Sequence, residues 1–188
     1  QDVWGSQLKT QHFEVFGKAG KVLDVPGQSI GFIYSFTQQK IDGFFGRNTL
    51  RSNQNSVYLN LMFQTYLNSS EHTLKSGISY QLDSYNKTVA AFLTDDVYAP
   101  IYSNSIPGIF SEYTWNPNEK FSLIGGIRAD YKESVGVFIS PRFNMRYAPD
   151  TKNTFRLGVG RGHRFANSPE ENLSIFASSR QPSINTLD

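Results

Sequence analysis

Hydrophobic residues recur at every second position over long stretches of this sequence. From residue 57 to residue 64, the apolar positions are Val57, Leu59, Leu61 and Phe63, and the positions between them are mostly polar. A period of two directs the two sets of side chains to opposite faces of a β-strand. The pattern therefore predicts a strand that lies between two unlike environments.

The same period continues in four other segments, at residues 74–82, 121–131, 137–147 and 155–160. The predicted strands are roughly ten residues long or more, about twice the usual strand length. The sequence lacks any run of about 18 apolar residues, which excludes a membrane-spanning helix. The segment from Gly17 to Gln28 is either a long link or an extension of the first strand. Eight strands are expected, near residues 8–17, 28–40, 55–67, 72–85, 106–116, 119–132, 136–148 and 153–164.

The predicted connections alternate between short and long. Tight hairpin turns are favoured where Asn, Pro, Asp and Ser gather, at residues 68–71, 116–119 and 149–153. Longer links are expected at residues 41–55 and 86–105, with a shorter link at 131–136 on the same side. An antiparallel up-and-down meander of this kind is typical of a transmembrane β-barrel with short periplasmic turns and long extracellular loops.

Large aromatic residues lie within a few positions of the three short turns. They are Tyr66, Trp115, Phe121, Tyr147 and Phe155. If these turns share one end of the sheet, the rings form a band at one depth, as amphipathic rings do at a membrane–water interface. The residues predicted to face lipid are apolar members of the alternation: Val57, Leu59, Leu61, Phe63, Ile127, Ile139, Phe143 and Leu157.

The amount of charge helps to separate this barrel from a soluble β-sandwich, which also alternates apolar and polar residues. The polar face of a sandwich meets water and should carry many Lys and Glu residues. Charged residues make up only 18% of this chain, against about a quarter in soluble domains. Arginine predominates on the polar face. The barrel is therefore favoured, and a secreted soluble β-sandwich that binds glycans or proteins is an alternative.

Several other classes of function find no support in the sequence. The net charge of +2 does not indicate a nucleic-acid partner, and the absence of cysteine excludes disulfides and thiolate metal sites. His12, His72 and His163 are scattered and have no ligand partner at a suitable spacing. The acidic pairs at 95–96 and 170–171 lack the spacing of a calcium loop. No catalytic residue, metal site or cofactor is predicted, and the chain is not expected to be an enzyme.

Three segments in the second half of the chain resemble a known family. Residues 125–131 read GGIRADY, residues 140–149 read SPRFNMRYAP, and residues 154–162 read TFRLGVGRG. This series resembles the mid-barrel strands of TonB-dependent outer-membrane receptors, especially those of Bacteroidetes-type bacteria. The resemblance covers residues 108–172 and extends more weakly over 28–86. It implies an outer-membrane barrel of about 22 strands that is closed inside by an N-terminal plug domain.

The resemblance also implies a function and a set of partners. Such a receptor captures a scarce large nutrient, such as a siderophore, cobalamin, haem or a glycan, and imports it with energy delivered through TonB. Its partners are outer-membrane lipid, the plug domain, the remaining barrel strands, TonB acting through the plug, and an extracellular nutrient. This chain holds about eight strands and has no recognisable plug or TonB box. We therefore expect residues 1–188 to be a partial barrel domain, with 165–188 as an extracellular loop or tail.

A complete small barrel of eight strands, acting as an anchor or adhesin, is a further alternative. A partial barrel would expose two sheet edges that need other strands. Exposed aromatic residues in the long loops, at 44–45, 98 and 102, are candidates for contact with a ligand or with neighbouring loops.

The polar face of the predicted strands carries the candidate site. These residues would pair with the plug, hold an anionic ligand, or form ion pairs with one another in a wet interior. They are Glu112, Arg128, Asp130, Arg142, Arg146 and Arg156.

Overall fold

The chain folds into one antiparallel β-sheet. The computed structural model describes residues 5–91, 96–98 and 101–163. No helix in this part of the chain is long and apolar enough to cross a bilayer. The strands are β1 (Ser6–Val22), β2 (Ser29–Phe45), β3 (Asn48–Leu67), β4 (Ser69–Ala91), β5 (Asp96–Tyr98), β6 (Ile101–Asn118), β7 (Phe121–Lys132), β8 (Gly136–Tyr147) and β9 (Phe155–Gly160).

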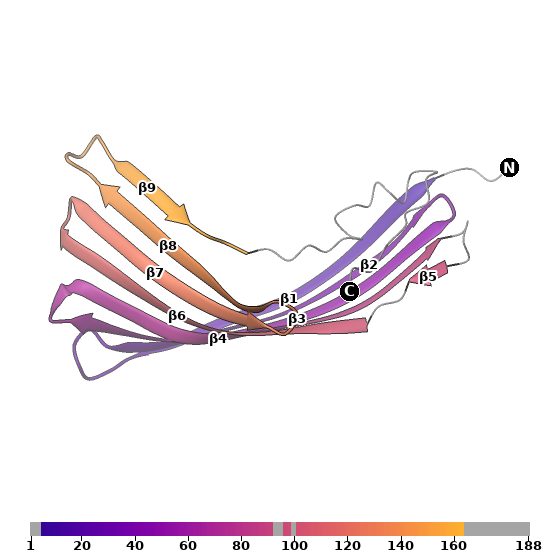
Figure 1. Ribbon diagram of the computed structural model, residues 1–188, viewed down its shortest axis with the longest axis horizontal. Helices are drawn as coiled ribbons and strands as arrows, with labels where there is room; N and C mark the ends of the chain where they lie inside the picture. The colour runs from indigo at the N-terminus through magenta and orange to yellow at the C-terminus, as the bar shows by residue number, and fades with distance from the viewer. Residues whose placement is uncertain (1–4, 92–95, 99–100, 164–188) are drawn as a thin grey trace.

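Each long strand pairs with its neighbours in the sequence. The strand order is β1-β2-β3-β4-β6-β7-β8-β9, and the short strand β5 pairs only with β4. Neighbouring strands run antiparallel, so the prediction of an all-β up-and-down meander is confirmed. The sheet curls into a trough, with β1 and β9 standing apart at its edges (Figure 1). Among the described residues, therefore, the sheet does not close into a complete barrel.

The strands near the N-terminus are longer than the sequence pattern predicts. β3 has 20 residues and β4 has 23. The expected long link at 41–55 is wrong, because β2 and β3 run through it and a tight turn at Gly46 and Arg47 joins them. Gly46 adopts a φ of 59°, which a glycine tolerates readily. The alternation fades in this region because the face that is apolar in the rest of β2 and β3 becomes polar, while the opposite face gains the apolar residues Ile41, Phe45 and Leu50, although the backbone ladder continues.

Short turns gather at the opposite end of the sheet, which we call the turn end. Asn68 has a φ of 69° between β3 and β4. The Asn118 Oδ1 atom accepts hydrogen bonds from the backbone N–H groups of Lys120 and Phe121, each at 3.0 Å. Asp150 binds the backbone in the same way beyond β8. The three predicted turns are therefore confirmed, and a fourth turn at 23–28 joins β1 to β2 at this end.

The ladders keep alternate residues on one face over the length of the sheet. Leu61 lies opposite Phe32 of β2 and opposite Ile78 of β4, and Ile78 in turn lies opposite Ile109 of β6. The β2–β3 ladder has no register shift, so every second residue of both strands shares the face of Leu61. We call this face convex and the opposite face, which lines the trough, concave.

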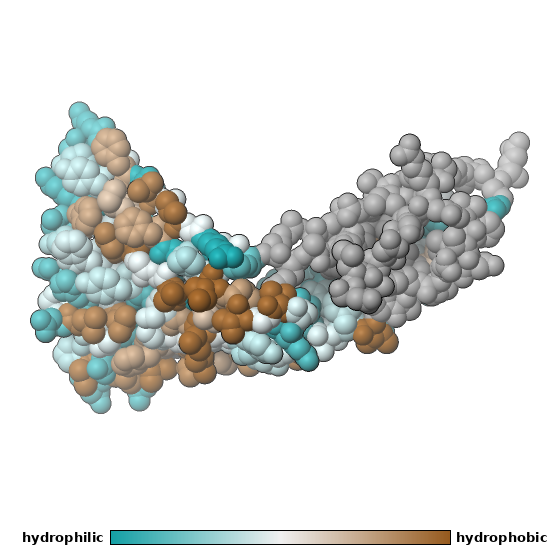
Figure 2. All heavy atoms as spheres, in the orientation of Figure 1, coloured by the Kyte–Doolittle hydropathy of each residue, from teal (hydrophilic) through white to brown (hydrophobic). Residues whose placement is uncertain are grey.

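Burial in this sheet is reversed relative to a soluble domain. The buried residues on the concave face are mostly polar or charged, and Ser79, Asp83 and Asp130 are each 6% exposed. On the convex face, Ile109 is 62% exposed. Figure 2 shows apolar side chains at the molecular surface over the half of the sheet that holds β6–β9. No second layer packs on the convex side of the described residues, so this sheet has no conventional hydrophobic core.

Candidate functional site

The middle of the concave face holds a hollow of about 460 Å³. Strands β3, β4, β6, β7 and β8 all contribute to its wall, and the β9 end adds one residue. Its lining includes Tyr58, Lys75, Glu112, Arg128 and Arg142. Three of the six residues predicted from the polar alternation therefore meet in one place. The register explains this, because alternate residues on neighbouring strands converge where the sheet curls.

One ion pair in this wall is held at three points. The Arg128 guanidinium donates from Nε to Asp130 Oδ2 at 2.7 Å and from Nη2 to Asp130 Oδ1 at 2.6 Å. Its Nη2 atom also donates to Ser79 Oγ at 2.7 Å. The Asp130 side chain is only 7% exposed, so its charge depends on this bidentate partner.

A missing side chain makes room for that ion pair. Gly108 lies between Ser79 and Asp130 in the cross-strand register. A Cβ atom at Gly108 would overlap Asp130 Oδ1 and would lie 2.9 Å from Ser79 Oγ and 3.0 Å from Arg128 Nη2. The three polar groups therefore meet across a position that only glycine can occupy without displacing them. We call Ser79, Gly108, Arg128 and Asp130 the Arg128 cluster.

The second ion pair repeats this arrangement further toward the turn end. Arg142 Nη2 donates to Glu112 Oε2, although β7 separates their strands. Gly126 lies between them in the register. A Cβ atom at Gly126 would lie 3.0 Å from Arg142 Nε. The arginine therefore crosses over a glycine to reach the carboxylate.

Two further arginines lie directly opposite each other near the turn end. Arg146 of β8 and Arg156 of β9 are paired in the register. Arg146 Nη1 donates to the backbone oxygen of Glu119 at 3.2 Å. Two like charges in directly opposed positions repel each other, so this part of the wall suits an anionic partner. The predicted set thus divides into the Arg128–Asp130 pair, the Arg142–Glu112 pair, and this pair of arginines.

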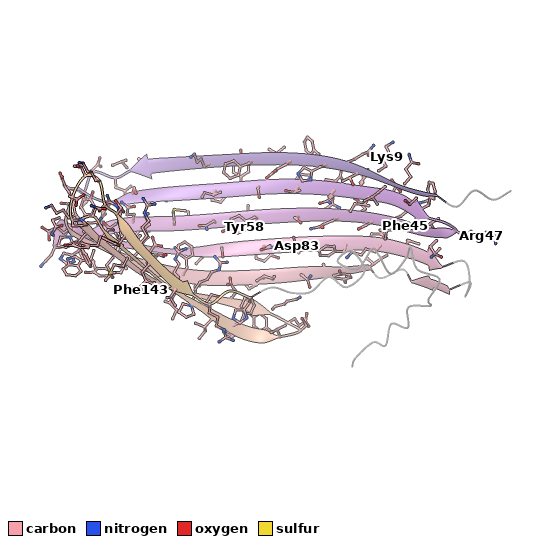
Figure 3. All side chains as sticks on the ribbon, turned by 90° about the horizontal axis from the view of Figure 1, so that it is seen from above. Lys9, Phe45, Arg47, Tyr58, Asp83 and Phe143 are labelled. Carbon is pink, nitrogen blue, oxygen red and sulfur yellow. The ribbon has the colours of Figure 1, made fainter. Side chains whose placement is uncertain are left out.

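The concave face also carries polar groups that the sequence interpretation did not single out. Asn60 Nδ2 donates to the Tyr58 hydroxyl at 2.8 Å, and Gln81 Nε2 donates to Asp83 Oδ2 at 2.8 Å. Tyr58 and Asp83 lie near the centre of the sheet in Figure 3. Their polar positions at 58, 60, 81 and 83 were visible in the alternation. Only the register shows that they continue the same wall.

An aromatic and basic group lies farther along the trough, toward the Gly46 end. The rings of Tyr85 and Tyr102 stack with 4.8 Å between centroids. Lys87 Nζ donates to the Tyr102 hydroxyl at 3.1 Å and lies 4.8 Å from the centroid of the Tyr85 ring. Tyr102, which was expected in a loop, is part of β6, and Phe45, also expected there, packs with Leu50.

The convex face gathers the residues that the sequence predicts to face lipid. Val57, Leu59, Leu61 and Phe63 alternate along β3, and the register puts the other four on the same face. Most of these side chains are exposed. We call this band the apolar belt; among the described residues it includes Phe32, Phe36, Val57, Leu59, Leu61, Phe63, Ile78, Ile109, Ile127, Ile139, Phe143 and Leu157.

Four of the five predicted aromatic residues adjoin one another at the turn end of the convex face. Phe121 lies opposite Tyr147, which lies opposite Phe155. The Trp115 ring meets Phe121 edge-on with 5.8 Å between centroids. Tyr66 is at the same end, but the register assigns it to the concave face. Its ring lies over Gly27 in the β1–β2 turn, whose φ is 78°.

The described residues contain no group of three or more His, Cys, Asp or Glu side chains that could hold a metal ion. His72 Nδ1 lies 2.5 Å from the Tyr113 hydroxyl, and His163 Nε2 lies 3.3 Å from the backbone oxygen of Ile139. The acidic residue at 95, the acidic pair at 170–171 and the tail at 165–188 lie outside the described residues.

Comparison with known proteins identifies a family. A family model described as "TonB dependent receptor-like, beta-barrel" matches residues 2–186 of this chain. The match therefore covers nearly the whole sequence. A search of curated proteins finds no match.

Proposed function

Because this chain belongs to the TonB-dependent receptor-like β-barrel family, we propose that it forms part of the wall of an outer-membrane nutrient receptor. The family is located in the outer membrane of Gram-negative bacteria, and its members are receptors and transporters rather than enzymes. The motifs at 125–131, 140–149 and 154–162 support a receptor of the Bacteroidetes type. The imported nutrient is large and scarce.

The observation that carries this proposal is the apolar belt. Large apolar side chains stay exposed across neighbouring strands, while buried residues of the concave face are polar. Fully burying a Leu, Ile or Phe side chain is worth about 1.5–3 kcal/mol, so a lipid environment would stabilise this sheet strongly. In water, an apolar surface of this extent would promote aggregation.

The open edges support the partial-barrel part of the proposal. Among the described residues, β1 pairs only with β2 and β9 pairs only with β8. An unpaired strand edge inside a bilayer leaves backbone groups without hydrogen bonds, so other strands of the same receptor must cover both edges. A complete barrel of eight strands would instead pair β1 with β9. We therefore assign residues 1–188 to part of a larger barrel.

The concave face would then line the lumen and contact a plug domain. Arg128, Arg142, Arg146 and Arg156 all belong to this face, and two of them already hold carboxylates of the wall. The other two provide a positive surface that suits carboxylates of a plug. TonB would act on this wall only indirectly, through that plug.

Site-directed labelling tests the assignment of the two faces. The chain has no cysteine, so Leu61→Cys and Asn60→Cys place one thiol on each face of β3. In outer-membrane vesicles that contain the full receptor, a lipid-soluble maleimide should label Leu61→Cys and spare Asn60→Cys. Ile109→Cys and Phe110→Cys form a second matched pair on β6. Equal labelling within both pairs would remove the membrane assignment.

A further inference from the structure

Toward the Gly46 end, the convex face of β2 and β3 changes from apolar to polar residues where the apolar belt ends. On β2 the convex residues from 30 to 36 are apolar or aromatic, and on β3 those from 57 to 63 are apolar. The next convex pair toward the Gly46 end is Gln38 and Asn55, and Gln38 Nε2 donates to Asn55 Oδ1 at 3.0 Å. On β2 and β3 the belt therefore ends at a pair of neutral amides, while Phe13 of β1 lies opposite Gln38 at the same level.

Charged side chains begin immediately beyond these amides. Lys40 follows Gln38 on the convex face of β2, and Asp42 follows Lys40. Asp42 lies opposite Lys9 of β1 on one side and opposite Arg51 of β3 on the other. These four residues, Lys9, Lys40, Asp42 and Arg51, form a patch that we call the basic rim. It contains three cations and one carboxylate.

The basic rim is open to solvent rather than closed by its own ion pair. Arg51 Nε lies 3.8 Å from Asp42 Oδ1, with the two side chains 81% and 64% exposed. An exposed ion pair of this length contributes little, so it leaves the arginine able to bind another anion. Figure 3 shows Lys9 near the same end of the sheet as Phe45 and Arg47, whereas Phe143 lies toward the other end.

The height of Lys40 above the belt brings its side chain close to the polar layer of a membrane. Lys40 is four residues beyond Phe36, or about 13 Å along a strand that rises about 3.3 Å per residue. For a barrel strand tilted by about 40°, this is about 10 Å along the membrane normal. Headgroups extend about 5–8 Å beyond the hydrocarbon on each side, and long basic side chains bend back toward them. Lys40 can thus reach the headgroup layer. Lys9 and Arg51, at the level of Asp42, are two residues farther, about 15 Å above the hydrocarbon, and approach this layer only with their long side chains bent toward the membrane.

We propose that the basic rim binds the phosphate groups of outer-leaflet glycolipid. The cations belong to the convex face, which is continuous with the belt and turned away from the lumen, so the partner is a lipid rather than the nutrient or the plug. Glycolipid of the Gram-negative outer leaflet carries phosphate on its sugars at this depth. Basic residues beside a membrane surface attract such anions. The binding would fix the depth and orientation of β1–β3 in the leaflet.

The test measures lipid binding to the full receptor in a neutral detergent by native mass spectrometry. The probe is lipid A with two phosphates, compared with its phosphate-free counterpart and with inorganic phosphate. Each cation near an anionic surface is worth about fivefold in affinity. The variant Lys9→Gln/Lys40→Gln/Arg51→Gln should therefore bind lipid A about a hundredfold more weakly. The phosphate-free lipid should bind the wild type weakly, and inorganic phosphate should not displace lipid A.

Two controls separate this site from general charge and from misfolding. Lys18→Gln/Lys120→Gln/Lys152→Gln removes the same net charge from the concave face and the turn end, and it should keep wild-type affinity. Asp42→Asn removes the single carboxylate of the basic rim and should tighten binding about fivefold, which a misfolded protein would not do. Equal losses in both triple variants, or displacement by inorganic phosphate, would overturn the proposal. Lipid labelling at Leu61→Cys in the same proteins shows whether only the basic rim, or the membrane assignment itself, has failed.

Discussion

Gly108 offers a sharp test of how the concave wall is built. Replacing it by alanine adds a Cβ atom that overlaps Asp130 Oδ1 and lies 3.0 Å from Arg128 Nη2. Aspartate is short, and this one is 7% exposed and held by two hydrogen bonds from Arg128, so it cannot move aside without a cost in free energy. The substitution should therefore break the bidentate contact between Arg128 and Asp130.

The expected size of the effect follows from the hydrogen bonds at risk. Asp130 receives two bonds from Arg128, at 2.6 and 2.7 Å, and a bond to a charged group is worth about 1.5–3 kcal/mol. Partial rehydration in a wet lumen recovers some of this. Alanine also loses less backbone entropy than glycine on folding into a strand, which offsets the loss of stability by about 0.5–1 kcal/mol more. We expect Gly108→Ala to lower the free energy of unfolding by about 2–3 kcal/mol.

The assay is equilibrium urea unfolding of the full receptor in lipid vesicles. Gly125→Ala is the matched control, because Gly125 is also a strand glycine, in β7 next to the β6 strand of Gly108, and has no heavy atom within 4 Å of the position that a Cβ atom would take. That variant should be neutral or slightly stabilising. In an Asp130→Ala background, Gly108→Ala should lose most of its effect, as expected for contacting residues. If Gly108→Ala matches the control, or if its penalty persists without Asp130, the reasoning is refuted.

Three further predictions follow from other parts of the sheet. Asn68→Ala should destabilise the receptor by about 1 kcal/mol in urea unfolding, because Asn68 has a φ of 69°, whereas Asn68→Gly should not. Ile127→Lys on the apolar belt should lower stability in vesicles by about 2–4 kcal/mol, and Asn144→Lys on the concave face of β8 should have a much smaller effect; equal losses would contradict the assignment of faces. Hydrogen bonds from the Asn153 side chain and from the backbone N–H groups of Lys152 and Asn153 lower the pKa of Asp150, so its stabilising effect is present above the ordinary Asp pKa and is lost as the pH falls through the lowered value. The stability difference between wild type and Asp150→Ala should therefore shrink under acid, and a difference that grew on acidification would rule this out.

The sequence was sufficient to predict the class of fold and the two faces. Alternation over segments such as 57–63 and 137–147 depends only on the environments of each face, which act residue by residue. The turns at 68–71, 116–119 and 149–153 were predictable because Asn68, Asn118 and Asp150 form local hydrogen bonds or adopt locally favoured conformations. Local chemistry of this kind is visible in a single chain.

The extent of the strands was not predictable in the same way. β2 and β3 continue through 41–55, where Asp42 and Arg51 replace the apolar residues of the convex face and the apolar residues Ile41, Phe45 and Leu50 lie on the concave face instead. Their ladder is held by backbone hydrogen bonds, which any side chain permits. Alternation reports that one face of a strand meets an apolar environment, and it does not report the length of the strand itself. The strands predicted from it therefore end near the limit of the apolar belt.

The candidate site was predicted in composition but not in arrangement. Arg128 and Asp130 are two residues apart and share a face by alternation alone. The contact between Arg142 and Glu112 spans two ladders, and it depends on Gly126 lying between them in the register. Register is set by every pairing in the sheet, so the sequence of one strand does not reveal it. Tyr66 was predicted to join the aromatic band because it lies near a turn. The register instead assigns it to the concave face, next to a bulge between Tyr66 and Leu67.

In the orientation proposed for this wall, the continuous β2–β3 hairpin would extend as a stiff projection on the extracellular side. If the belt marks the bilayer, the Gly46–Arg47 tip is ten residues beyond Val57, or about 25 Å above the hydrocarbon for a tilted strand. A ladder of this length moves as a unit, unlike a free loop. Short epitope tags inserted at that tip would therefore stand clear of the lipid sugars, in reach of antibodies and bacteriophage tail fibres, while leaving the submerged part of the receptor undisturbed.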